Sequence, residues 1–152
     1  MSVLIREAVE GDLPAVLALY AQPGMDDGQV LSLDQARETW RQFVRYPSYR
    51  LFVAEEGGAV VATYALLVMH NLAHQGTPSA IAEDVVVSDT HQRRGLGRQL
   101  IAHAIEQARV AGCYKLALSS NAKRASAHAF YRSLGFQQHG LSFLIDTSRN
   151  LP

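Results

Sequence analysis

The sequence predicts an α/β (α+β) fold in which strands and helices follow one another along a single domain of 152 residues. Three observations support this prediction. A run of three valines at 85–87 is typical of a buried strand. Apolar residues recur at helical spacing after Gly97. A Glu-Gly-Gly turn at 56–58 separates two apolar runs, as in a β-hairpin.

The other elements follow from the same patterns in chain order. We expect strands over residues 3–7, 49–55, 59–69, 79–87 and 115–119, and a last hairpin from Phe136 onward and over 141–145. We expect helices from Asp12 to Tyr20, from Ser32 to just before Pro47, from the glycine turn to Ala111, and over about 125–134. Together these strands predict a sheet of six to seven strands.

Composition limits the classes of function. The formal net charge is zero, which argues against bulk binding to nucleic acid or to a membrane surface. The single cysteine, Cys113, excludes an internal disulfide and a cysteine metal cluster, and we expect it to be a small buried residue without a catalytic role. No long apolar run and no basic apolar leader are visible, so we expect a cytoplasmic protein.

The turn between the valine strand and the following helix has the features of an anion site. Gly95 and Gly97 leave backbone N–H groups uncovered at a helix start, and Arg93, Arg94 and Arg98 add positive charge. The turn lacks the third glycine of a dinucleotide fingerprint and the Gly-Lys-Ser/Thr of a P-loop. The ligand that the turn predicts carries phosphate.

Two adjacent carboxylates, Glu83 and Asp84, enter the apolar strand just before the valines. Strand alternation predicts that they point to opposite faces of the sheet. A carboxylate among apolar strand residues has a raised pKa, which suits a general base. The alternative is that both carboxylates are solvated at the solvent-exposed end of the strand.

Two histidines and two aromatic residues are further candidates for ligands or pocket walls. His70 and His74 have no carboxylate or cysteine at ligand spacing and no HExxH context, so we expect no metal. Tyr20 fits either the core or the wall of a substrate pocket, and we expect Trp40 to be core.

Two motifs resemble those of one known family. Gln92-Arg93-Arg94-Gly95-Leu96-Gly97 is similar to the Q/R-x-x-G-x-G/A pyrophosphate motif of the GNAT superfamily of acetyl-CoA-dependent N-acetyltransferases. The stretch from Ala127 to Phe136 resembles the second motif of that family, which ends in FY-x-x-x-GF. Residues 81–87 and 112–115 look like segments of glucosamine-phosphate N-acetyltransferases. Residues 120–124 and 127–131 look like segments of aminoalkylphosphonate acetyltransferases.

The resemblance implies a mixed, twisted sheet with helices on both faces, in which the parallel strands at 83–87 and 115–119 splay apart. It implies acetyl-CoA as the acetyl donor and no metal. The cofactor-binding residues that it implies are Val85, Val86, Val87, Gln92, Arg93, Arg94, Gly95, Leu96, Gly97, Arg98, Asn121 and His128. Lys123 or Arg124 either reaches the nucleotide phosphates or is solvated surface charge.

In that family a free amine attacks the thioester directly, so no protein nucleophile is needed. Glu83 is the first choice for the base that takes the amine proton, directly or through water, and Asp84 is the second. A backbone N–H near Val85 is the candidate oxyanion donor. Tyr131 holds the position of the family's general acid, with a rim tyrosine as the alternative.

The acceptor stays open at this point. The favoured reading is acetylation of a small primary amine that carries an anionic group; the alternatives are a protein N-terminal or lysine acetyltransferase and a non-catalytic acyl-CoA-binding module. The partners expected are therefore the amine and acetyl-CoA, without nucleic acid or membrane. The family is often dimeric through edge strands or the C-terminal hairpin, so a homodimer is the assembly that the resemblance implies.

Overall fold

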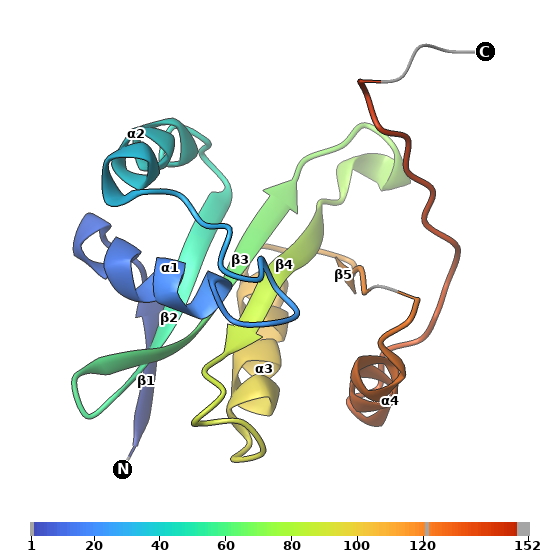
Figure 1. Cartoon of the computed structure of the whole chain (residues 1–152). Helices are drawn as coiled ribbons and strands as arrows, with labels where there is room; N and C mark the ends of the chain where they lie inside the picture. The colour runs from blue at the N-terminus through green and yellow to red at the C-terminus, as the bar shows by residue number, and fades with distance from the viewer. Residues whose placement is uncertain (1, 121, 149–152) are drawn as a thin grey trace. The chain divides into compact units, whose positions relative to one another are not determined.

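A computed structural model describes residues 2–120 and 122–148 of the chain (Figure 1). These residues form two compact units, one up to Leu118 and one from Ser119 onward, and each is described by itself. The first unit contains the sheet and helices α1 to α3, and the second contains helix α4.

The first unit is built on a five-stranded sheet whose strands lie in the order β1-β2-β3-β4-β5. The strands are β1 (Val3–Glu7), β2 (Tyr49–Glu56), β3 (Ala59–Met69), β4 (Ser79–Val87) and β5 (Leu116–Leu118). Neighbours from β1 to β4 are antiparallel, and β4 pairs with β5 in parallel. The predicted mixed sheet and the hairpin at 56–58 are confirmed.

Helices cover both faces of this sheet (Figure 1). The helices are α1 (Leu13–Tyr20), α2 (Leu33–Phe43) and α3 (Leu96–Val110), with short 3-10 turns η1 (Glu10–Asp12) and η2 (His74–Gly76). Leu100 and Ala104 of α3 pack with Tyr64 and Leu66 on one face. On the other face, Val16 of α1 packs with strand residues, and Trp40 and Phe43 of α2 lie against the same cluster. The 3.6-residue apolar spacing of each helix therefore corresponds to its buried side.

The second unit contains α4 (Ala125–Ser133), close to its predicted position. The two strands expected from Phe136 onward and over 141–145 are not seen, since residues 136–146 are irregular and the described residues pair no strand with them. The sheet of the described residues therefore has five strands and not six to seven. The apolar side chains at 141–145 suit a strand, but a strand also needs a neighbour that pairs its backbone N–H and C=O groups.

Candidate active site

A β-bulge in β4 brings both carboxylates to one face of the sheet. The pairing with β3 shifts between Thr63↔Val86 and Ala65↔Glu83, and Asp84 has a left-handed backbone with φ of 52°. Ala82 before the bulge and Val85 after it both pack on the α3 side. Glu83 and Asp84 therefore both face the α1–α2 side, and the predicted alternation of the two carboxylates is wrong because the bulge adds one residue to the strand.

The bulge coincides with the end of the β4–β5 pairing. The last parallel partners are Ala82 and Leu118, whereas β4 continues to Val87. Residues 83–87 thus extend past the last residue of β5 in the first unit. Val86 is 8% exposed and pairs with Thr63 of β3.

Glutamine side chains hold the end of β4. The carbonyl of Val87 accepts hydrogen bonds from Nε2 of Gln22 at 3.1 Å and from Nε2 of Gln92 at 3.3 Å. The backbone N–H of Asp89 donates to Oε1 of Gln22 at 2.8 Å. Gln22 therefore links the loop after α1 to the strand end. Gln92, a predicted cofactor residue, also turns back onto β4, and nothing in the sequence pattern indicated the role of Gln22.

The predicted phosphate turn is a curled loop that opens α3. Arg93 and Gly95 have positive φ angles of 62° and 83°. The φ angles of their neighbours Gln92, Arg94 and Leu96 are not positive. Alternating signs of φ turn successive N–H groups toward one concave side, which is the geometry of an anion-binding nest. Gly95 is the N-cap of α3 and has no side chain to cap the first turn, so the first N–H groups of this helix stay available.

The three arginines of this turn differ in their surroundings. Arg94 forms an ion pair with Glu56 at the end of β2, with Nη2 3.1 Å from Oε1. The Glu56 side chain is 8% exposed, and Nε2 of His91 lies 3.3 Å from it on the other side. Arg94 therefore anchors the turn to the β2–β3 hairpin. Arg93 and Arg98 are exposed and form no ion pair with described residues, so their charge is left for a ligand.

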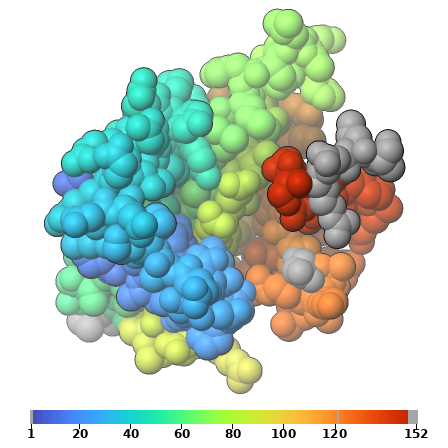
Figure 2. All heavy atoms as spheres, turned by 45° about the horizontal axis from the view of Figure 1, so that its top comes forward, coloured from blue at the N-terminus to red at the C-terminus, as the bar shows by residue number. Residues whose placement is uncertain are grey.

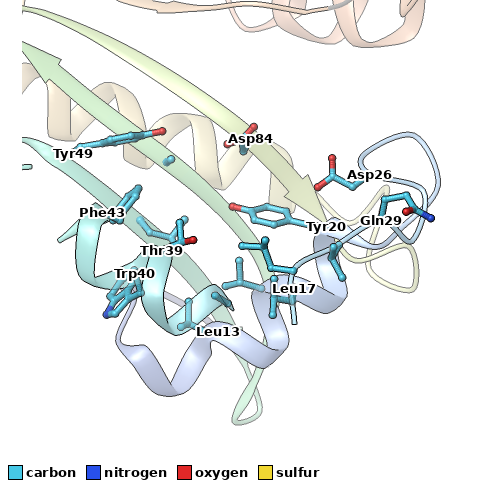
Figure 3. A pocket seen from close by; sticks show the side chains of 16 residues that line it. Leu13, Leu17, Tyr20, Asp26, Gln29, Thr39, Trp40, Phe43, Tyr49 and Asp84 are labelled. Carbon is cyan, nitrogen blue, oxygen red and sulfur yellow. The ribbon is translucent and has the colours of Figure 1, made fainter. Parts of the chain in front are cut away.

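A cavity of about 500 Å³ lies in the first unit between α1, α2 and the sheet (Figure 3). Its aromatic wall comprises Tyr20, Trp40, Phe43 and Tyr49, and two of its polar groups are the carboxylates of Asp26 and Asp84. In the space-filling view, the blue to cyan atoms of the loop after α1 and of α2 stand beside the yellow-green atoms of β4 (Figure 2). Tyr20 is thus a pocket wall, and Trp40 belongs to both the core and the cavity.

The carboxylates and tyrosines at this cavity interact. Oη of Tyr49 donates a hydrogen bond to Oε2 of Glu83 at 3.0 Å. Burial raises the pKa of Tyr49 to about 12, and its hydrogen bond to Glu83 adds to the shift. Partial burial raises the pKa of Asp84, as do the negative charges of Glu83 and Asp26. Burial also raises the pKa of Tyr20, with a contribution from Asp84. These groups therefore form one electrostatic cluster.

Tyr131 lies in the last turns of α4 in the second unit. Its ring contacts Phe136 edge-on at a centroid distance of 5.9 Å, and Phe130 at 5.5 Å. Burial raises its pKa, and the charge of Arg124 opposes that shift. A raised pKa keeps the phenol protonated at neutral pH, as an acid requires. His128 lies on the same helix, and Asn121, the other cofactor residue predicted in this region, lies outside the described residues.

Within residues 2–120 and 122–148, no group of three or more His, Cys, Asp or Glu side chains is arranged to hold a metal ion. None of the described helices is long and apolar enough to cross a bilayer.

The fold described above is similar to that of a solved protein described as an acetyltransferase. A solved protein of Agrobacterium tumefaciens str. C58, to which an acetyltransferase activity has been ascribed, is 37% identical with a TM-score of 0.87, over 94% of this chain and 99% of that one. The pattern of the Acetyltransferase (GNAT) family matches residues 14–136, and the chain belongs to this family. The predicted family is thereby confirmed.

Two of the similar proteins are named for the acetylation of small amines. An aminoalkylphosphonate N-acetyltransferase of Salmonella typhimurium is 30% identical over 139 residues, which cover 91% of this chain and 88% of the relative. A glucosamine 6-phosphate N-acetyltransferase of Trypanosoma brucei brucei is 32% identical over 97 residues, and this match spans 64% of each chain.

Proposed function

We propose that this protein transfers the acetyl group of acetyl-CoA to the primary amine of a small acceptor, by direct attack within a ternary complex. The observation that carries the proposal is the course of β4: the strand presents Asp84 at a cavity, with Glu83 bonded to the lining residue Tyr49, and then leads directly into the curled turn that opens α3. Membership of the acetyltransferase family supports it.

The turn before α3 fits the diphosphate of acetyl-CoA. A diphosphate requires several N–H donors on one concave surface and positive charge nearby. The alternating φ signs at 92–96 supply such donors, and the exposed Arg93 and Arg98 supply charge. Val85 and the uncovered edge of β4 beyond β5 would align the pantetheine arm, since open backbone groups pair with amides.

The reaction requires two protons to leave the ammonium form of the amine and one proton to reach the departing sulfur. An alkylamine has a pKa of about 10 and reaches the site mainly as ammonium. Glu83 takes its proton, directly or through water, with Asp84 as the second candidate. The neutral amine then attacks the thioester carbonyl to form the C–N bond, and a backbone N–H near Val85 stabilises the negative oxygen of the tetrahedral intermediate. The nitrogen loses its second proton to water as the C–S bond breaks, and Tyr131 protonates the thiolate. The products are an N-acetyl amide and coenzyme A.

The proposal treats residues 1–152 as one N-acetyltransferase domain, in line with a family match that runs from the first unit into the second. It places the protein in the cytoplasm, as a homodimer whose partners are acetyl-CoA and a small amine. The names of the relatives favour an acceptor with an anionic group.

A thiol-release assay with acetyl-CoA and a panel of amines tests the proposal. The panel comprises amino sugars, aminoalkylphosphonates, amino acids, polyamines, aminoglycosides and peptides, with mass spectrometry of the products. We expect amine-dependent thiol release and a product heavier by one acetyl group. Turnover of peptides alone would indicate a protein acetyltransferase, and coenzyme A binding without turnover of any amine would indicate a non-catalytic module.

A further inference from the structure

The charges around the cavity differ from those expected for an anionic acceptor. Of the sixteen described residues that line it, two are aspartates and none is lysine, arginine or histidine. Glu83 adds a third carboxylate next to this wall through its hydrogen bond with Tyr49. A phosphate or phosphonate placed here would meet like charges, which repel strongly in a partly desolvated cavity.

The two aspartates come from different elements and face the same space. Asp84 belongs to the bulge of β4, and Asp26 belongs to the loop after α1 (Figure 3). The charge of Asp26 contributes to the raised pKa of Asp84, and the charges of both act on Tyr20. Both carboxylates therefore add negative charge to the same cavity, Asp84 from the strand next to Glu83 and Asp26 from the loop.

The rest of the wall is aromatic and aliphatic. The rings of Trp40 and Phe43 stack at a centroid distance of 5.6 Å, and the ring of Phe43 meets that of Tyr49 at 4.5 Å. Leu13, Val16 and Leu51 complete the wall near them. Aromatic faces attract cations, and an apolar wall requires an apolar ligand body.

From these observations, and resting on the proposed function, we infer that the acceptor is a cationic amine with an apolar or aromatic body and no anionic group. Asp26 is the specificity-determining residue: its carboxylate attracts the ammonium and repels amines that carry phosphate, phosphonate or carboxylate. Its side chain accepts none of the hydrogen bonds found among the described residues, whereas its backbone N–H bonds to the carbonyl of Tyr20 at 3.0 Å. Substitution of the Asp26 side chain should therefore leave the loop in place.

The single tryptophan of the chain, Trp40, lies in the wall of this cavity and reports ligand binding by its fluorescence. The experiment titrates the protein at pH 7 with 2-phenylethylamine, 2-aminoethylphosphonate and 3-phenylpropionate, without acetyl-CoA. We expect saturable binding of 2-phenylethylamine at least about 10-fold tighter than that of either anionic compound. Equal or tighter binding of 2-aminoethylphosphonate would overturn the inference.

Asp26→Asn and Asp27→Asn form a matched pair of variants. Asp27 is the next residue, does not line the cavity, and accepts a hydrogen bond from the N–H of Gly24 at 2.8 Å that asparagine retains. We expect Asp26→Asn to weaken the binding of 2-phenylethylamine by about 3–10-fold, because one partly exposed charge is lost. Asp27→Asn should change this affinity by less than about twofold. Equal effects of the two substitutions would contradict the role of Asp26.

Equilibrium binding separates this inference from the proposed function. Saturable 2-phenylethylamine binding that Asp26→Asn weakens, together with no thiol release for any amine, contradicts acetyl transfer but supports the cationic site. Thiol release that is faster with 2-aminoethylphosphonate than with 2-phenylethylamine supports acetyl transfer and contradicts the cationic acceptor.

Discussion

The phenolic oxygen of Tyr49 donates a hydrogen bond of 3.0 Å to Oε2 of Glu83. The two residues are 34 positions apart in the sequence and meet because β2 and β4 flank β3 in the sheet. The pKa of Tyr49 is about 12, so the phenol remains a donor across the neutral and mildly alkaline range. The bond fixes one oxygen of Glu83 and leaves the other to accept a proton from the amine.

Glu83→Gln is expected to lower kcat about 10²-fold, the usual contribution of a general base. The amide oxygen of glutamine still accepts the hydrogen bond of Tyr49, so the cavity should stay intact. Steady-state thiol release against amine concentration measures the effect. Glu106→Gln, on the exposed side of α3, is the control and should retain full activity. A Glu83→Gln enzyme within twofold of the natural protein would remove Glu83 from the mechanism.

Asp84→Asn is expected to stabilise the protein at neutral pH. The folded pKa of Asp84 is raised above its ordinary value of 3.8, mainly by burial. The folded and unfolded states are therefore equally protonated below pH 3.8, and the folded state loses relative stability as the pH rises through its own higher pKa. Asparagine removes this loss and also tolerates the left-handed backbone at this position.

Thermal unfolding followed by circular dichroism measures this effect at pH 7 and at pH 4. We expect the melting temperature of Asp84→Asn to exceed that of the natural protein by about 1–2 °C at pH 7, since access of solvent to the carboxylate keeps the effect small. The gain should shrink toward pH 4. A variant that melts lower than the natural protein at pH 7 would show that ionised Asp84 stabilises the fold.

Arg94→Ala is expected to lower stability, whereas Arg98→Ala is expected to weaken the binding of coenzyme A. Loss of Arg94 leaves the nearly buried Glu56 with His91 as its remaining partner, which should cost about 1–2 kcal/mol of unfolding free energy.

Arg98 is exposed in the first turn of α3, so Arg98→Ala should leave the unfolding free energy unchanged. The same variant should bind coenzyme A about 3–10-fold more weakly. Urea unfolding and calorimetric titration measure the two quantities. Unchanged coenzyme A affinity in Arg98→Ala would remove Arg98 from the diphosphate site.

Tyr131→Phe is expected to lower kcat about 10²-fold or more while coenzyme A still binds, because only the hydroxyl is removed. Phenylalanine preserves the ring contacts with Phe130 and Phe136. Tyr114→Phe is a matched control at an exposed tyrosine beside His74 and should keep its kcat. An unchanged kcat in Tyr131→Phe would mean that another group or water protonates the thiolate.

The sequence predicted those parts of the fold that local patterns determine. The three valines at 85–87, the glycine turn and the helical spacing after it correspond to the end of β4, the curled loop and α3. The bulge at Asp84 has no comparable signal, because no glycine marks its left-handed position. Alternation counted along the strand therefore predicted opposite faces for Glu83 and Asp84, whereas the bulge brings both to one face.

Contacts between distant segments explain what else could not be predicted. Arg94 and Glu56 are 38 positions apart, and their ion pair depends on where the β2–β3 hairpin lies next to the turn. Gln22 and Asp26 lie in a loop whose Gly and Asp residues predict only turns, whereas the fold brings that loop to β4 and to the cavity. The expected strand over 141–145 likewise depended on a neighbouring strand, which a sequence pattern does not identify.

Calorimetric titration of Gly97→Asp with coenzyme A tests the central claim most directly, namely that the turn at 93–98 holds a diphosphate. We expect coenzyme A to bind at least about 100-fold more weakly, because the new carboxylate occupies the place of the diphosphate. The melting temperature should not fall, since acidic residues are favourable in the first turn of a helix. Gln42→Asp adds the same charge on α2, away from the turn, and should bind coenzyme A normally. Normal coenzyme A affinity in Gly97→Asp would contradict the account.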